Sequence, residues 1–166
     1  MYEQLSLLAE LSVGLAGFSS IIVVFRRGAG SPSWRPEDVF RLKIMLSYSL
    51  LGALFSIAPP GLMGLGIPDN IVISLASFLL GLCLGTYFIL GWRRYRALPA
   101  DSLSRSLAGV LSFVGVFFML VAGLNAFSLL PSPGLGPYVA AVTWLLVAAG
   151  IMFYRLVTAP LGRESS

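Results

Sequence analysis

The sequence predicts an all-α integral membrane protein, a single domain built as a bundle of five transmembrane helices. Composition gives the first reason: 57% of the 166 residues are hydrophobic and 11% are charged, and the mean hydropathy is +0.90, whereas about a quarter of the residues in a soluble domain are charged. Chain length gives the second reason. Each span needs about 20 apolar residues, which leaves room for four or five helices and short loops, and a soluble catalytic or ligand-binding domain does not fit.

Five apolar stretches have the length that a span requires. They lie near residues 4–25, 38–58, 70–92, 104–130 and 137–157. The N-terminus, MYEQLSLL, lacks the positive region of a secretory signal, so we expect the first stretch to remain as a span. The loop before the second span is RRGAGSPSWRPED, and its Pro36 suits the first turn of a helix. Short turns, GIPDN and PSPGLGP, precede the third and fifth spans.

The end of the second span has two alternatives. The span runs into FSIAPPGLMGLG, where Pro59 and Pro60 remove two backbone donors and bias Ala58 away from helical geometry. Either the helix ends there, which we favour because prolines commonly follow helix ends, or it kinks and continues. A broken segment that continues at membrane depth must be covered by protein or line water.

The basic residues predict the orientation, because topology follows Lys and Arg in short loops. All eleven flank the first loop, the third loop or the C-terminus: Arg26, Arg27, Arg35, Arg41, Lys43, Arg93, Arg94, Arg96, Arg105, Arg155 and Arg163. The opposite side carries Glu3, Glu10 and Asp69 and no base. With an odd number of helices, this bias places the N-terminus outside and the C-terminus in the cytoplasm.

Aromatic residues at the span boundaries agree with this orientation. The outer boundary has Tyr2 and Tyr138, and the inner boundary has Trp34, Trp92, Tyr95 and Tyr154. The net charge of +4 needs no nucleic-acid partner, because basic residues near a span contact anionic lipid headgroups. We expect these contacts from Arg26, Arg27, Arg93, Arg94 and Arg96.

Residue counts exclude several kinds of chemistry. The chain has no histidine and a single cysteine, Cys83, so a zinc site, a disulfide and a Cys/His nucleophile pair cannot form within one chain. No GxSxG, HExxH, P-loop or paired-carboxylate pattern occurs, and the isolated serines have no basic partner at a suitable depth. We expect neither an enzyme nor a bound cofactor or metal.

A polar stripe lies on the first span. At about 100° per residue, Ser6, Glu10, Gly14 and Gly17 share one narrow face with Glu3. Glu10 lies about five residues, or roughly 7.5 Å, below the outer end of the span. An ionised group that faces lipid at this depth costs several kcal/mol. We therefore expect the carboxyl group to face polar or hydrated surroundings.

Asn125 is the polar residue at nearly the same depth, about five residues from the outer end of the fourth span. No Lys or Arg lies in the outer half of any span, which excludes a salt bridge to Glu10 within the chain. The sequence therefore predicts a hydrogen bond between Glu10 and Asn125. Glu10 is then either a protonated group that joins helices or a functional residue, whereas Asn125 alone is more typical of helix packing.

Small residues on the third and fourth spans predict close helix contact, because residues of this size let helix backbones approach in lipid. One side of the third span has Ser74, Ser77, Gly81 and Gly85, and one side of the fourth has Ala108, Ser112, Gly115, Ala122 and Ala126. We expect these two helices to pack on each other within the chain. The polar stripe of the first span is then free to face the bundle centre or a symmetry axis.

The stretch ELSVGLAGFSSIIVVFRR, followed by a Trp, an Asp and RLKIML, resembles a group of short, uncharacterised bacterial inner-membrane proteins. The resemblance covers roughly the first two helices and rests on Glu10, Gly14, Gly17, Phe18, Arg26, Trp34, Asp38 and Arg41. It implies a multi-pass protein of the bacterial cytoplasmic membrane. It implies no activity and no catalytic residues.

The leading functional hypothesis is a homo-oligomeric channel or pore. Five helices leave no room for an aqueous pathway in one chain, whereas several copies around an axis can line one with the polar stripe, and rings of acidic side chains favour cations. The alternative is a non-conducting membrane subunit that binds a protein partner or lipid through basic loops and small-residue faces. A third hypothesis is a bundle that binds a small molecule in an apolar cavity with Glu10 and Asn125 as its polar groups, opened by the break at Pro59 and Pro60.

Overall fold

The computed structural model describes residues 3–28, 36–95 and 102–158. Within these ranges the chain forms α-helices and no strand: α1 (Glu3–Gly28), α2 (Pro36–Gly64), α3 (Asp69–Tyr95), α4 (Ser102–Ala126) and α5 (Leu135–Thr158). All five are long and apolar enough to cross a membrane. The predicted all-α fold with five helices is therefore confirmed, and it is compatible with a multi-pass membrane protein.

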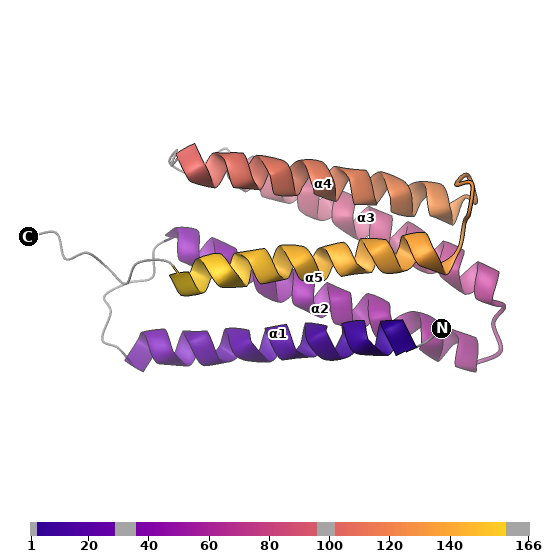
Figure 1. The fold of residues 1–166 in the computed structure, drawn as a ribbon, viewed down its shortest axis with the longest axis horizontal. Helices are drawn as coiled ribbons and strands as arrows, with labels where there is room; N and C mark the ends of the chain where they lie inside the picture. Colours follow the sequence, from indigo (N-terminus) through magenta and orange to yellow (C-terminus); the bar gives the residue numbers. More distant parts are fainter. Residues whose placement is uncertain (1–2, 29–35, 96–101, 159–166) are drawn as a thin grey trace, which may run out of the picture.

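The helices lie side by side along one axis and alternate in direction (Figure 1). The N-terminus and the turns from α2 to α3 and from α4 to α5 lie at one end, called here the N-terminal end of the bundle. At the opposite, C-terminal end, α1, α3 and α5 finish and α2 and α4 begin. In the described part of the chain, α1 contacts only α2 and α5, whereas α5 contacts all four other helices. This makes α5 the central helix.

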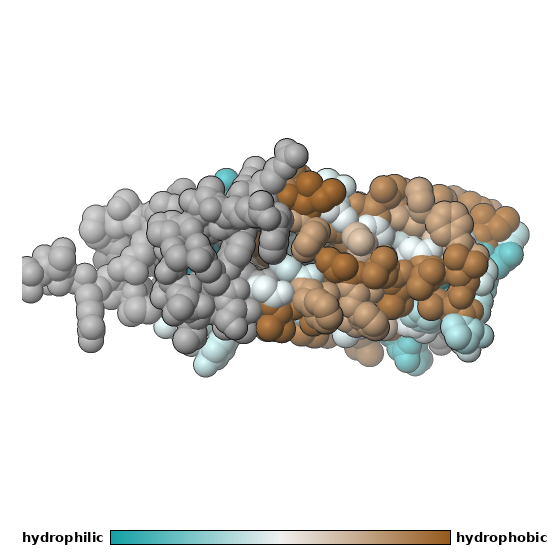
Figure 2. Space-filling model, turned by 90° about the horizontal axis from the view of Figure 1, so that it is seen from above, coloured by the Kyte–Doolittle hydropathy of each residue, from teal (hydrophilic) through white to brown (hydrophobic). Residues whose placement is uncertain are grey.

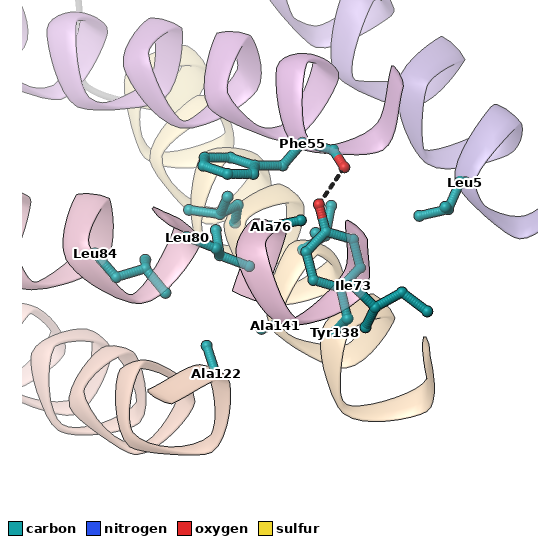
Figure 3. Packing of buried hydrophobic residues seen from close by; sticks show 11 residues of the cluster. Leu5, Phe55, Ile73, Ala76, Leu80, Leu84, Ala122, Tyr138 and Ala141 are labelled. Carbon is teal, nitrogen blue, oxygen red and sulfur yellow. Dashed lines mark hydrogen bonds between the residues drawn. The ribbon is translucent and has the colours of Figure 1, made fainter. Parts of the chain in front are cut away.

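Two clusters of buried side chains hold the helices around α5. The larger cluster, drawn in Figure 3, consists of Leu5, Phe55, Ile73, Ala76, Leu80, Leu84, Ala122, Tyr138, Ala141, Val142 and Leu145. The smaller cluster consists of Met45, Ala149 and Leu156 from α2 and α5. Every helix contributes at least one side chain to the larger cluster, so the five helices share one core.

Helix α2 continues through Pro59 and Pro60 to Gly64. Proline has no N–H, so Pro59 cannot bond the carbonyl of Phe55, four residues earlier. The hydroxyl of Tyr138 on α5 donates a hydrogen bond to that carbonyl instead (Figure 3). The neighbouring helix replaces the bond that the proline removes. The alternative in which the second helix ends at residue 58 is therefore wrong.

The Tyr138 side chain lies inside the bundle and not on its surface. We expected its ring at the boundary of a span, where aromatic side chains are common. The side chain is 0% exposed and belongs to the larger core cluster. A buried tyrosine hydroxyl needs a hydrogen-bond partner, and the Phe55 carbonyl is that partner.

The outside of the bundle is apolar over most of the described helices. Figure 2 shows hydrophobic residues over much of the described surface on the side where α4 lies, and hydrophilic residues near the N-terminal end. Leu7, Leu11, Phe113 and Phe117 are more than half exposed, at 59, 61, 78 and 56%. An apolar surface of this extent marks a contact with a membrane or a partner rather than with water.

Tyr138 and Pro59 should be coupled energetically. The Tyr138→Phe variant leaves the Phe55 carbonyl without its donor, so we expect the free energy of unfolding in detergent to fall by about 1–3 kcal/mol. The Pro59→Ala variant regains an N–H for the same carbonyl, so Tyr138→Phe should cost less in that background. Thermal unfolding of the four proteins measures the coupling.

The matched control for this cycle is Tyr154→Phe. Tyr154 is 67% exposed, so removal of its hydroxyl should change the free energy of unfolding little. If Tyr138→Phe cost the same with and without Pro59, the hydrogen bond would not compensate for the proline.

Candidate functional site

Helix α1 packs on the bundle with one face. Leu5, Ser12 and Ser19 are fully buried along this face, and the helices that α1 contacts are α2 and α5. The hydroxyls of Ser12 and Ser19 donate hydrogen bonds to the carbonyls of Leu8 and Leu15, at 2.7 and 2.8 Å. Serine is tolerated in this buried interface because its hydroxyl is satisfied within α1 itself.

The opposite face of α1 carries the polar stripe. Ser6, Glu10, Gly14 and Gly17 are all exposed, and at about 100° per residue they lie roughly 120–160° around the helix from the buried face. A Cβ atom added at Gly14 or Gly17 would meet no other atom within 4 Å. The stripe points away from the other described helices, so the alternative in which it faces the bundle centre is wrong.

Glu10 and Asn125 do not meet. Within the described residues α1 has no contact with α4, and α5 lies between them (Figure 1). Asn125 is 2% exposed, whereas Glu10 is exposed. The predicted hydrogen bond between these residues is therefore wrong: similar depth along the bundle did not determine which helix faces are in contact.

Asn125 joins α3, α4 and the turn before α5. Its Nδ2 donates to Ser77 Oγ at 2.8 Å and to the Gly134 carbonyl at 3.0 Å, and its Oδ1 accepts from the Gly134 N–H at 2.8 Å. Gly134 has a φ of 142°, a backbone conformation that glycine adopts at low cost. Both amide hydrogens of Asn125 are used in these contacts, so the side chain fixes the fold and has no free donor for a ligand.

The small residues of α3 face α4. A Cβ on Gly81 would lie 3.5 Å from the Met119 carbonyl oxygen and 3.6 Å from the Gly123 nitrogen, and a Cβ on Gly85 would lie 3.1 Å from Met119 Sδ. Ser77 is buried on the same helix and accepts the hydrogen bond from the amide on α4. The two helices approach closely along this line, as small residues permit.

The small residues of α4 serve more than one neighbour. A Cβ on Gly115 would lie 3.7 Å from Nε1 of Trp144, so Gly115 faces α5 rather than α3. The Trp144 ring stacks on Phe118 with 5.7 Å between ring centroids. Ser112 is half-buried. The close contact between α4 and α5 depends on this glycine and the aromatic stack.

The helix order brings the basic residues of the helices to one end of the bundle, where Glu37 and Asp38 also lie, and places three acidic residues near the other end. Glu3, Glu10 and Asp69 lie near the N-terminal end, because they belong to the start of α1 and of α3. The basic residues of the helices lie toward the C-terminal end, where α1, α3 and α5 finish and α2 and α4 begin. Of the residues expected to bind lipid headgroups, Arg96 lies outside the described part of the chain, as do the side chains of Arg26, Arg27, Arg93 and Arg94.

The described residues offer little other chemistry. No group of three His, Cys, Asp or Glu side chains among them could hold a metal ion, and Cys83 is free and half-buried. Comparison with protein-family models, curated proteins and solved structures gave no match. The function of the α1 stripe therefore has to be inferred from its geometry and chemistry.

Two polar features inside the bundle were not found from the sequence. One is the hydrogen bond from Tyr138 to the Phe55 carbonyl, and the other is a pair of buried hydroxyls on α2, Ser49 and Ser56, that have no hydrogen-bond partner in the described part of the chain. A proline in α2 indicates that the carbonyl four residues earlier lacks its donor within the helix. Two serines seven residues apart in an apolar span indicate a polar face. Neither pattern identifies the helix that lies opposite.

Leucine in place of Gly81 should push α3 away from α4. The larger side chain has no space against the backbone of Met119 and Gly123, so we expect the Tm of Gly81→Leu in detergent to fall by about 4 °C or more, from an overpacking cost of about 1–3 kcal/mol. Gly109→Leu is the matched control, because a Cβ at Gly109 meets nothing within 4 Å. Equal Tm values for the two variants would show that the helices do not approach closely at Gly81.

Proposed function

We propose that the chain is a membrane-inserted subunit of a homo-oligomeric channel, in which the α1 stripe of each copy faces a shared pathway. The observation that carries this proposal is the position of the stripe. Ser6, Glu10, Gly14 and Gly17 are exposed and lie opposite the face with which α1 packs on α2 and α5. One protomer cannot surround the stripe with its own helices, whereas further copies around an axis would surround it.

The carboxyl group of Glu10 makes contact between the stripe and lipid costly. Glu10 lies seven residues after Glu3, the first residue of α1, or about 10 Å along the helix axis. A charged side chain at the bilayer centre costs about 2.5–3.5 kcal/mol on insertion scales. Water in a pathway, or a polar group of a neighbouring copy, would remove most of this cost. Assembly through α1 is therefore favoured over exposure of α1 to lipid.

We assign the N-terminus to the outside and the C-terminus to the cytoplasm of a bacterial cytoplasmic membrane. Cytoplasmic loops are rich in Lys and Arg, and the helix order brings the basic residues of the helices to the C-terminal end. These residues would contact anionic headgroups, so the net charge of +4 requires no nucleic-acid partner. The resemblance of the first two helices to bacterial inner-membrane proteins supports the choice of membrane.

The proposed pathway would favour cations. Glu3 and Glu10 lie near the same end of α1, and assembly would multiply them into rings, one pair for each copy. Rings of carboxylates favour cations, and a cleft lined by one sign of charge raises the local concentration of its counterions. This function needs no cofactor and no enzymatic step.

A non-conducting subunit is the second candidate. The open space around Gly14 and Gly17 would admit the backbone of another helix, which is how helices associate closely in lipid. On this alternative the same face of α1 binds a transmembrane helix of a protein partner, or lipid, and no pathway forms. The small-molecule alternative loses its support, because Glu10 and Asn125 lie on separate parts of the bundle.

Ion flux in liposomes separates the two candidates. We expect purified wild-type oligomers to conduct K⁺, and we expect Glu10→Gln to lower this flux about tenfold, which corresponds to about 1.4 kcal/mol of lost attraction for the cation. The matched control is Asp69→Asn. It removes one acid from the same end of the bundle on α3, which does not contact α1 in the described residues, and it should keep most of the flux.

The possible results differ clearly. Well-folded wild-type oligomers without flux would exclude the channel and leave the non-conducting subunit. A protein that stays monomeric in mild detergent would contradict homo-assembly. An equal loss of flux in both variants would assign the effect to general surface charge and not to the stripe.

A further inference from the structure

Four serine side chains are buried on α1 and α2. Ser12 and Ser19 belong to α1, and Ser49 and Ser56 belong to α2. Each is at most 1% exposed. Buried hydroxyls in an apolar bundle need hydrogen-bond partners. Each of these four hydroxyls is therefore expected to have one.

Gly52 marks where Ser12 of α1 meets α2. A Cβ on Gly52 would lie 2.8 Å from Ser12 Oγ on α1 and 3.8 Å from a side-chain carbon of Leu146 on α5. Gly52 therefore marks the junction of α1, α2 and α5. Ser49 and Ser56 lie three residues before and four residues after Gly52 and are displaced from it by about 60° and 40° in the same direction around the helix. Tyr48, four residues before Gly52, is displaced by about 40° in the other direction, so the two serines lie on the other side of Gly52 from Tyr48.

Helix α3 lies on a different side of α2. There Tyr48 packs edge-on against Tyr87 of α3, with 5.8 Å between the ring centroids. Tyr48 is about 100° from Ser49 around the helix. The hydroxyls of Ser49 and Ser56 are therefore not directed at α3.

The serines of α1 and α2 differ in their hydrogen bonds. Ser12 and Ser19 donate to carbonyls of their own helix, whereas Ser49 Oγ and Ser56 Oγ are buried and have no partner among the described residues. An unpaired buried hydroxyl costs about 1–3 kcal/mol. The backbone carbonyl of Ser56 also lacks its usual donor within the helix, because Pro60, four residues later, has no N–H.

The spacing of the hydroxyls along the junction suits single water molecules. Helices α1 and α2 run in opposite directions, and Ser12 is level with Gly52. Ser56 is then about 6 Å from Ser12 along the axis toward the N-terminal end, and Ser49 is about 4.5 Å from it in the other direction. One water molecule joins two oxygens about 5.5 Å apart, which is twice the usual O–H···O distance.

We propose that the junction of α1, α2 and α5 binds ordered water at Ser56 and Ser49. One water accepts a hydrogen bond from the Ser56 hydroxyl and donates to the Ser56 carbonyl and to Ser12 Oγ. A second water accepts from the Ser49 hydroxyl and donates to Ser12 Oγ. Each water then has two or three polar partners, as buried waters do. The site lies on the face of α1 opposite the Glu10 stripe, so it does not depend on the channel.

Thermal unfolding and an experimental structure test this site together. We expect Ser56→Ala to lower the Tm in detergent by about 2–4 °C, because the bound water loses the hydrogen bond that the Ser56 hydroxyl donates to it. Removal of a dry, unpaired hydroxyl would instead raise the Tm or leave it unchanged. Ser20→Ala, at an exposed position of α1, is the matched control. A structure at about 2 Å resolution should show density for one water about 2.6–3.0 Å from Ser56 Oγ and for a second water at the same distance from Ser49 Oγ.

The Pro60→Ala variant tests the role of the proline. It regains an N–H for the Ser56 carbonyl, so the water no longer donates its hydrogen bond to that carbonyl. Ser56→Ala should then shift the Tm less in the Pro60→Ala background. A raised or unchanged Tm for Ser56→Ala, an equal shift in both backgrounds, or a junction without water density would each overturn the proposal. A negative flux measurement would leave it standing.

Discussion

The carbonyls that prolines leave without a donor in α2 have to be satisfied inside the bundle, and this requirement determines how α2 and α5 are joined. A buried carbonyl without a partner costs about as much as a lost hydrogen bond. The hydroxyl of Tyr138 satisfies the Phe55 carbonyl and so fixes the position of α5 along α2. Since α5 contacts all four other helices, the placement of the whole bundle depends on this contact.

The other helix contacts combine close packing with single hydrogen bonds. Gly81 brings the α3 backbone close to α4, and Asn125 joins α4 to Ser77 and to the turn before α5. This combination is expected for helices that associate in lipid, where neighbouring apolar chains give no hydrophobic drive for association. The few buried polar groups therefore decide which helix faces meet.

The number, order and approximate length of the helices follow from the sequence, because a span needs a long apolar stretch and loops need Gly, Pro and charged residues. The extent of α2 did not follow. The local rule that proline ends a helix was overridden by Tyr138, which lies 83 positions from Phe55 in the chain, and no local pattern reports such a partner.

The candidate site was likewise predicted in part from the sequence. Helical periodicity was sufficient to group Ser6, Glu10, Gly14 and Gly17 on one face. Depth along the span placed Glu10 and Asn125 near the same end of the bundle, but the pairing predicted from it was wrong. The sequence does not show which neighbour each helix face meets, because that depends on the order in which the five helices pack. That order separates Glu10 from Asn125 by α5 and turns the stripe outward.

The two faces of α1 explain why this helix differs from α4. The outer face of α4 carries large apolar side chains such as Phe113 and Phe117, which is the pattern expected of a helix that borders only lipid. Helix α1 instead has buried serines toward α2 and α5 and an exposed acid with two glycines on the opposite face. Large apolar residues such as Leu7 and Leu11 flank that acid, so the surface is suited neither to water nor to acyl chains alone. A surface with this mixture gains most from contact with protein and hydrated groups together, which is the surrounding that further copies of α1 would supply.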